Sequence, residues 1–270
     1  MSESYFTIER SGSREWIVPT ALARGPWDYD SCHGGPPTAM LARALERELP
    51  HQRLCRISVE LGRPVPMAGF RIETEVVRAG RASAQTRATL VDGAGKARVT
   101  AIGMHLAPLD APLFEGTLHN ADVATPKVAD TEPGEFPMRR ATTQWPGFRG
   151  SVEVRYPPDQ AVGEPTTVYM RTVPPLPDEE PSPFQRICPL ADCGNAFSRQ
   201  ADPEIFQFIN TDLVIALHRE PVGEWMGSRS WAHWQPDGVG LADALLFDDT
   251  GPVGRALQTL LLRRAPETVA

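Results

Sequence analysis

The alternation of apolar and polar residues over the first 107 positions predicts one helix followed by antiparallel strands. Apolar residues recur at helical spacing between residues 40 and 49, with charged residues on the opposite face. The sequence GGPP at residues 34–37 precedes this run, and proline suits a first helical turn because the amide hydrogen it lacks has no partner there. The later runs, such as RIETEVV at residues 71–77, alternate like strands with one buried face.

The same pattern returns after a proline-rich stretch. Residues 184–199 have helical character, and strand-like runs follow them up to residue 264. When Gly95 is set against Gly251, the last hairpins of the two halves match in length and pattern, and Gln258 falls opposite Ile102. We interpret the match as an internal duplication.

A long helix wrapped by a curved antiparallel sheet is the hotdog arrangement, and two such units make a double hotdog. The predicted fold class is therefore α+β, with two helix-wrapped antiparallel sheets in one chain that form a pseudo-dimer. We expect an N-terminal hotdog at residues 1–107, a proline-rich linker at 108–147 and a C-terminal hotdog at 148–270.

Composition and charge exclude some classes of function. The chain has 270 residues, is 41% hydrophobic and carries a net charge of −7, so it lacks the basic excess of a nucleic-acid binder. No apolar run reaches the ~20 residues that cross a bilayer, and the N-terminus does not read as a signal peptide. We expect a cytoplasmic protein without nucleic-acid or membrane partners. The four cysteines fit no metal spacing, and we expect reduced, inert thiols.

Two segments resemble the acyl-CoA thioesterase II (TesB-like) family. These are HGGPPTAMLARALERE from residue 33 and the C-terminal run from TDLVIALHREPVGEW at residue 211 to RALQTLLLRR. The resemblance implies a double-hotdog enzyme of lipid metabolism that hydrolyses fatty acyl-CoA thioesters and needs no metal or cofactor. Its partner is then an acyl-CoA substrate, and we expect a homo-oligomer.

The family holds one water with an Asp, a Ser or Thr and a Gln. On this sequence the resemblance puts the Asp at Asp192 and the Gln at Gln258, whereas the hydroxyl position carries Asn210 with Thr211 beside it. We expect Asp192, Asn210 and Gln258 to be catalytic, with Asp192 as general base. Simpler interpretations stay open: an exposed or capping Asp192, and a Gln258 that only bonds backbone groups.

The glycines at residues 34 and 35 suggest substrate binding at the start of the first helix. Amide hydrogens there can stabilise an oxyanion, although glycine also serves close packing of a helix on its neighbours. His33, beside them, is a third substrate-binding candidate. Asp28 and His33 also resemble the Asp-x-Asn-Pro-x-His pattern of hotdog enoyl-CoA hydratases, so a hydratase or dehydratase is one alternative function. A non-catalytic acyl-CoA binding protein is the other.

Overall fold

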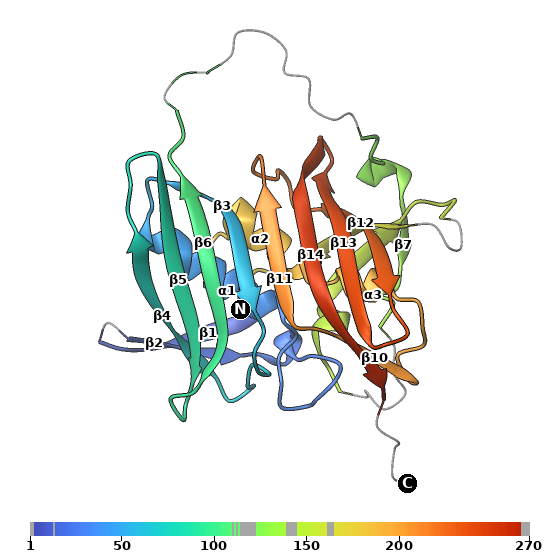
Figure 1. Cartoon of the computed structure of the whole chain (residues 1–270), viewed down its shortest axis with the longest axis horizontal. Helices are drawn as coiled ribbons and strands as arrows, with labels where there is room; N and C mark the ends of the chain where they lie inside the picture. Colours follow the sequence, from blue (N-terminus) through green and yellow to red (C-terminus); the bar gives the residue numbers. More distant parts are fainter. Residues whose placement is uncertain are drawn as a thin grey trace.

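The computed structural model describes residues 3–12, 14–109, 111, 113, 123–138, 145–160 and 165–265. Its described strands form a single large antiparallel sheet, and the helices lie on one face of that sheet (Figure 1). Between residues 97 and 106 every second side chain of the strand is buried against the helical layer, which is the period-2 pattern expected from the sequence.

The first unit is the predicted helix with its strands. Helix α1 begins at the GGPP sequence, and its capping residue Gly34 makes no side-chain cap. The elements of this unit are β1 (Phe6–Ser11), β2 (Arg14–Pro19), the 3-10 turn η1 (Ala21–Ala23), α1 (Gly35–Glu48), β3 (Arg53–Glu60), β4 (Phe70–Arg78), β5 (Ser83–Asp92) and β6 (Ala97–Leu106).

The second unit repeats this order with two interruptions. Its helix is broken at residues 192–193, and its central strand is broken at residue 211. Its elements are η3 (Phe148–Ser151), β8 (Val152–Tyr156), β9 (Thr166–Thr172), α2 (Pro183–Ala191), α3 (Gly194–Phe197), β10 (Phe206–Asn210), β11 (Asp212–Leu217), β12 (Met226–Trp234), β13 (Val239–Asp248) and β14 (Gly251–Arg264).

The order of the strands confirms the double-hotdog prediction. The first unit contributes β1-β2-β4-β5-β6-β3, and the second continues as β11-β14-β13-β12-β9-β8. This order reads the same from either end, as a pseudo-two-fold axis between β3 and β11 requires. Because β3 and β11 are hydrogen-bonded antiparallel, the two expected sheets are joined into one (Figure 1).

The connection between the units also contributes structure. Its described part contains the 3-10 turn η2 (Val128–Asp130) and β7 (Glu132–Gly134), which pairs with β8 at the edge of the sheet. Phe136 and Met138 follow β7 and are buried. Much of the rest of the proline-rich stretch lies outside the described residues, and the division into residues 1–107, 108–147 and 148–270 stays a prediction.

The hairpin alignment made from sequence needs a shift of one residue. Both hairpins contain a bulge near the turn, but the turn between β5 and β6 is one residue longer than the turn between β13 and β14. Gly95 and Gly251 are therefore not equivalent. Counted from the bulge, Gln258 corresponds to Gly103 and not to Ile102, because each is the fifth residue after the bulged residue of its strand.

No helix in the described part of the chain is long and apolar enough to cross a membrane.

Candidate active site

A cavity of about 470 Å³ lies where the two units meet. Its walls come from the loop before α1, the loop after β3, strand β10, the α2–α3 junction and the connecting segment. The lining contains both polar and apolar side chains, and three of the polar ones, His33, Asp192 and Asn210, lie within hydrogen-bond distance of one another through the Asp192 carboxylate. The polar lining includes His33, Asp192, Asn195 and Asn210; the apolar lining includes Trp27, Leu61, Val65, Phe136, Met138 and Phe208.

Asp192 is a nearly buried carboxylate at the end of α2. It is the C-cap residue of that helix and is 4% exposed. One carboxylate oxygen, Oδ1, accepts a hydrogen bond from Asn210 Nδ2 at 2.6 Å, and the other, Oδ2, lies 3.0 Å from His33 Nδ1. A buried carboxylate needs such partners because desolvation disfavours its charge. The alternative of an exposed Asp192 is therefore wrong, whereas its position as the C-cap of α2 fits the capping alternative.

The two glycines let α1 begin directly against this carboxylate. A Cβ atom on Gly34 would lie 2.9 Å from Asp192 Oδ2, and a Cβ on Gly35 would lie 2.8 Å from the Cα of Pro189. Any larger residue would push the helix start away from α2. The positive end of the α1 dipole therefore meets a negative charge at van der Waals distance.

His33 is held in place by contacts on both its ring and its backbone. Its ring stacks on Phe148 with centroids 4.0 Å apart, and its amide donates to the Ala23 carbonyl. Its Nδ1 atom lies near the Asp192 carboxylate and also 3.2 Å from the amide of Gly35. An Nδ1–H donates to Asp192, whereas in the other tautomer Nδ1 accepts from Gly35, so the tautomer selects one of the two bonds.

Gln258 bonds backbone groups beside Asp192 and does not touch its carboxylate. Its Nε2 donates to the Asp192 carbonyl at 2.9 Å, and its Oε1 accepts from the Asn195 amide at 2.9 Å. The side chain is 1% exposed and does not line the cavity. The Gln258 side chain can approach this backbone because residue 194 is glycine. A Cβ atom at residue 194 would lie 3.0 Å from Gln258 Oε1. Gln258 thus fixes the α2–α3 junction that carries Asp192.

Asn210 is the last residue of β10 and faces the cavity. The strand breaks after it, and Thr211 donates its hydroxyl to the Thr259 carbonyl instead of contacting the cavity. The site therefore uses the amide at position 210 and not the hydroxyl beside it. The Asn210 amide oxygen accepts no hydrogen bond from the described residues, which leaves it available to a water or substrate.

The equivalent positions in the first unit carry different residues. The residue that pairs with β6 where Asn210 pairs with β14 is Leu54, and Gly103 replaces Gln258. The side chains of Thr86 and His105 fill the space next to Gly103. They form a buried hydrogen bond of 2.8 Å between Thr86 Oγ1 and His105 Nε2. The described residues thus hold the Asn–Asp arrangement in the second unit alone.

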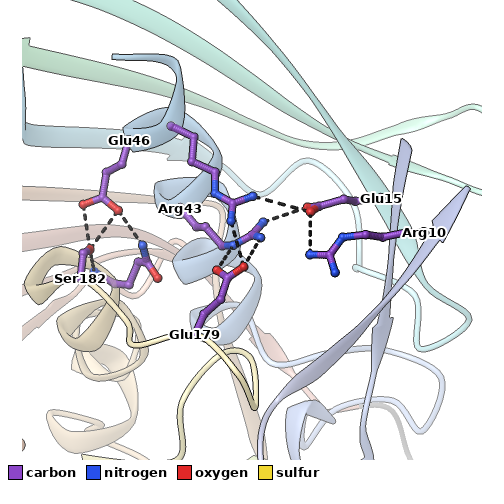
Figure 2. Close-up of polar contacts among 8 residues, drawn as sticks. Arg10, Glu15, Arg43, Glu46, Glu179 and Ser182 are labelled. Atoms are coloured by element: carbon purple, nitrogen blue, oxygen red, sulfur yellow. Dashed lines mark hydrogen bonds and ion pairs between the residues drawn. The ribbon is translucent and has the colours of Figure 1, made fainter. Parts of the chain in front are cut away.

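The carboxylate of the first unit that corresponds in place to Asp192 is Glu46 on α1. It faces the start of α2, where it accepts bonds from Ser182 Oγ at 2.8 Å and Gln185 Nε2 at 2.7 Å (Figure 2). Each helix therefore presents a carboxylate to the first turn of the other. Glu46 is not part of the cavity lining, so its contacts serve the packing of α1 on α2.

We predict that Glu46→Gln leaves kcat/KM for thioester hydrolysis unchanged. Burial raises the pKa of Glu46, so its ionised form costs stability as the pH rises through that pKa. The glutamine carries no such cost. The free energy of unfolding of the variant should therefore improve relative to wild type between pH 4.5 and pH 7, as measured by denaturant titration. A fall in kcat/KM without unfolding would contradict this prediction.

The cysteines are poor nucleophiles in this structure. All four lie in the described residues and are unpaired, and burial raises the pKa of the Cys32 thiol to about 12 and that of Cys193 well above its usual value. A thiol that stays protonated is a weak nucleophile.

The described residues also contain no group of three His, Cys, Asp or Glu side chains placed to hold a metal ion.

Sequence reasoning missed the residues that complete the walls. Phe136 and Met138 lie in the stretch taken for a linker, and no periodic pattern marks them. Asp28 also lines the cavity, but its carboxylate accepts from Ser31 Oγ and the Asp30 amide, while the carboxylate beside His33 is Asp192. The predicted Asp28–His33 pair is therefore not formed.

Comparison with known families identifies both halves. The acyl-CoA thioesterase N-terminal domain matches residues 23–105, and the acyl-CoA thioesterase C-terminal domain matches residues 122–262. A comparison with curated proteins gives no match.

Solved structures share the fold over nearly the whole chain. A candidate thioesterase from Novosphingobium aromaticivorans superposes with a TM-score of 0.75 at 18% identity, covering 96% of this chain and 98% of that one. Acyl-CoA thioesterase II TesB2 of Mycobacterium marinum gives 0.68 at 17% identity, covering 97% and 98%. A hotdog-fold protein from Alicyclobacillus acidocaldarius gives 0.73 at 15% identity, covering 96% of each chain. These likenesses support the double hotdog, and the two matching domains show that the chain belongs to the acyl-CoA thioesterase family and is a thioester hydrolase.

Proposed function

We propose that the protein hydrolyses acyl-CoA thioesters with a water activated by Asp192 and held by Asn210. The observation that carries the proposal is the 2.6 Å hydrogen bond between these side chains on the polar wall of the cavity. Each carboxylate oxygen can accept more than one hydrogen bond, so a water can bond Asp192 and the free oxygen of Asn210 together. A base within hydrogen-bond reach of its water meets the first geometric requirement of general-base catalysis.

The reaction then follows from the placement of the groups. Asp192 takes a proton as the water oxygen attacks the thioester carbonyl carbon. The carbonyl oxygen becomes an oxyanion, and the carbon–sulfur bond breaks as that anion collapses. The proton on Asp192 passes to the leaving sulfur, so water and thioester give a free acid and a thiol. The apolar wall with Trp27, Phe136 and Phe208 receives the acyl chain.

The start of α1 supplies the oxyanion site in this proposal. Gly34 lines the cavity, and its amide donates to no acceptor in the described part of the chain. Because residues 36 and 37 are prolines and the Gly35 amide faces His33, Gly34 is the free donor of this first turn. His33 and Gly35 then act on the substrate indirectly. His33 positions the Asp192 carboxylate, and Gly35 lets α1 begin close to α2.

Gln258 acts as a positioning residue in the proposed mechanism. It binds the backbone on both sides of the bend that carries Asp192, so its effect on a reacting water passes through that carboxylate. Assembly into a homo-oligomer stays a prediction.

The Asn210→Leu variant tests the site, because it installs the residue that the first unit carries at this position. We expect kcat for an acyl-CoA to fall about 10–100-fold, since the reacting water loses a hydrogen-bond partner worth about 1.5–3 kcal/mol. Thiol release measured across a series of acyl-CoAs gives the rates. Asn210→Thr, with a hydroxyl at this position, is the matched control and should retain more activity than the leucine variant.

Other outcomes decide between the alternatives. Hydration of an enoyl-CoA without thiol release would favour the hydratase. Binding of acyl-CoA with neither reaction would favour the non-catalytic binding protein. Equal rates for wild type and Asn210→Leu would remove Asn210 from the mechanism.

A further inference from the structure

Two arginines in the lining of the same cavity form no ion pair with the described residues. Arg63 lies in the loop after β3, and Arg263 lies near the end of β14 next to Gln207 of β10. Both arginines are exposed, whereas Asp192 is buried, so they mark the solvent side of the cavity. Gln207 is three residues before Asn210 on β10, a separation of about 10 Å along an extended strand.

The hydrogen bonds of these arginines leave their outer nitrogens available. Arg263 Nε donates to Gln207 Oε1 at 2.7 Å, and Gln207 is itself nearly buried, so the guanidinium is oriented while both of its NH2 groups have no partner in the described residues. The Arg63 guanidinium has no acceptor among the described residues either. Both carboxylates of the cavity lining have other partners: Asp28 accepts two hydrogen bonds, and Asp192 lies against Asn210 and His33.

This arrangement differs from that of arginines elsewhere in the chain that are paired with carboxylates. Arg43 and Arg219 lie against carboxylates at 2.6–3.0 Å, where their charge is neutralised. The chain carries a net charge of −7, so acidic residues outnumber basic ones. Two arginines on one cavity without a carboxylate partner among the described residues therefore indicate a binding site for an anion. Guanidinium groups bind phosphate with paired hydrogen bonds that match its geometry.

We propose that Arg63 and Arg263 bind the phosphates of coenzyme A at the mouth of the cavity. The inference rests on the proposed function and gives the substrate a direction. The pantetheine arm runs from the thioester at Asp192 along β10 to the two arginines, and the acyl chain lies toward Phe136 and Met138 on the apolar wall. The enzyme would then recognise the nucleotide end of its substrate by charge and the acyl end by burial.

The test compares substrates with and without the phosphates. Arg63→Gln, Arg263→Gln and the double variant are assayed with an acyl-CoA and with the acyl-pantetheine that carries the same acyl group. We expect each single variant to raise KM for acyl-CoA about 5–10-fold, with KM for acyl-pantetheine and both kcat values unchanged. Arg87→Gln, an exposed arginine paired with Glu75 and away from the cavity, is the control and should behave as wild type.

Two further measurements separate the possible failures. Added salt should raise the wild-type KM for acyl-CoA and leave that for acyl-pantetheine unchanged. Calorimetric titration with CoA itself should show weaker binding to the double variant even if no thioester is hydrolysed, which keeps this inference distinct from the proposed reaction. Equal KM changes for both substrates, or unchanged CoA affinity in the double variant, would overturn it. Use of the phosphopantetheine of an acyl carrier protein in preference to acyl-CoA would also overturn it.

Discussion

Asp192→Asn should lower kcat/KM for acyl-CoA hydrolysis by about 10²–10⁴-fold, the range typical of a lost general base. The asparagine has the shape of the aspartate, and its amide oxygen can still accept from Asn210, so the α2–α3 junction should stay in place. The amide cannot take the proton of an attacking water. Thiol release under single-turnover conditions measures the effect, and the far-ultraviolet circular dichroism should match wild type.

Glu46→Gln is the matched control for this substitution. It removes one carboxylate charge at the corresponding place in the first unit, where the structure shows packing contacts to α2 (Figure 2). Loss of activity in Asp192→Asn with retention in Glu46→Gln would locate the chemistry in the second unit. Full hydrolysis by Asp192→Asn would remove Asp192 from the mechanism and leave the family membership intact.

Arg43→Met should lower the free energy of unfolding by about 3 kcal/mol at pH 7, the low end of the range for breaking a buried ion pair. Arg43 is 4% exposed and holds Glu15 at 3.0 Å and Glu179 at 2.6 Å (Figure 2). These contacts join the β1–β2 hairpin, α1 and the segment before α2. Methionine keeps the apolar stem of the side chain but removes the buried guanidinium. Among the described residues, Glu15 then keeps only Arg10 and Arg47 as partners, and Glu179 keeps only Arg47.

The pH dependence of Arg43→Met follows from its two carboxylates. Burial raises the pKa of Glu15, but the hydrogen bonds and charges of Arg43, Arg10 and Arg47 together outweigh burial and hold that pKa below the usual 4.5. For Glu179 the hydrogen bond from Arg43 is the largest influence, and the pKa is again below 4.5. A lowered pKa in the folded state means that the stabilisation is present above pH 4.5 and disappears as the pH falls through the folded values. The difference between wild type and variant should therefore shrink below pH 4.5.

Denaturant unfolding at pH 7 and at pH 3.5 measures this effect. Arg71→Met removes an exposed pair with Glu73 and should cost less than about 1 kcal/mol at either pH. A loss for Arg43→Met no larger than that of Arg71→Met would show that the buried cluster adds no stability.

The fold was predictable because it depends on local patterns that occur twice. The helical period after GGPP and the alternating strands identify each unit, and short turns order the strands. The register was less predictable, because one extra residue in a turn shifts an alignment without changing the pattern. Bonding of Gln258 to backbone groups was one of the interpretations open from sequence, but the groups it bonds, at residues 192 and 195, are brought near only by the fold.

The contacts within the site could not be read from spacing. His33 was compared with Asp28, five residues away, yet its carboxylate neighbour is Asp192 in the other unit. Phe136 reaches the cavity from a segment without periodicity, and Arg63 and Arg263 meet there from loops and strand ends far apart in sequence. Side chains that converge from separate elements leave no local pattern, so sequence identifies candidates but not their neighbours.

The reciprocal contact between the two helices also bears on how such a chain can evolve. In a dimer of identical subunits every substitution appears in both copies. A residue that is exchanged for better packing in one copy is therefore also exchanged in the other, even where it serves catalysis. Once the two copies are fused, each can vary alone. Leu54 and Gly103 in one half, and Asn210 and Gln258 in the other, show that the two copies have diverged at equivalent positions, so that, under the mechanism proposed above, selection for packing and selection for hydrolysis act on separate residues.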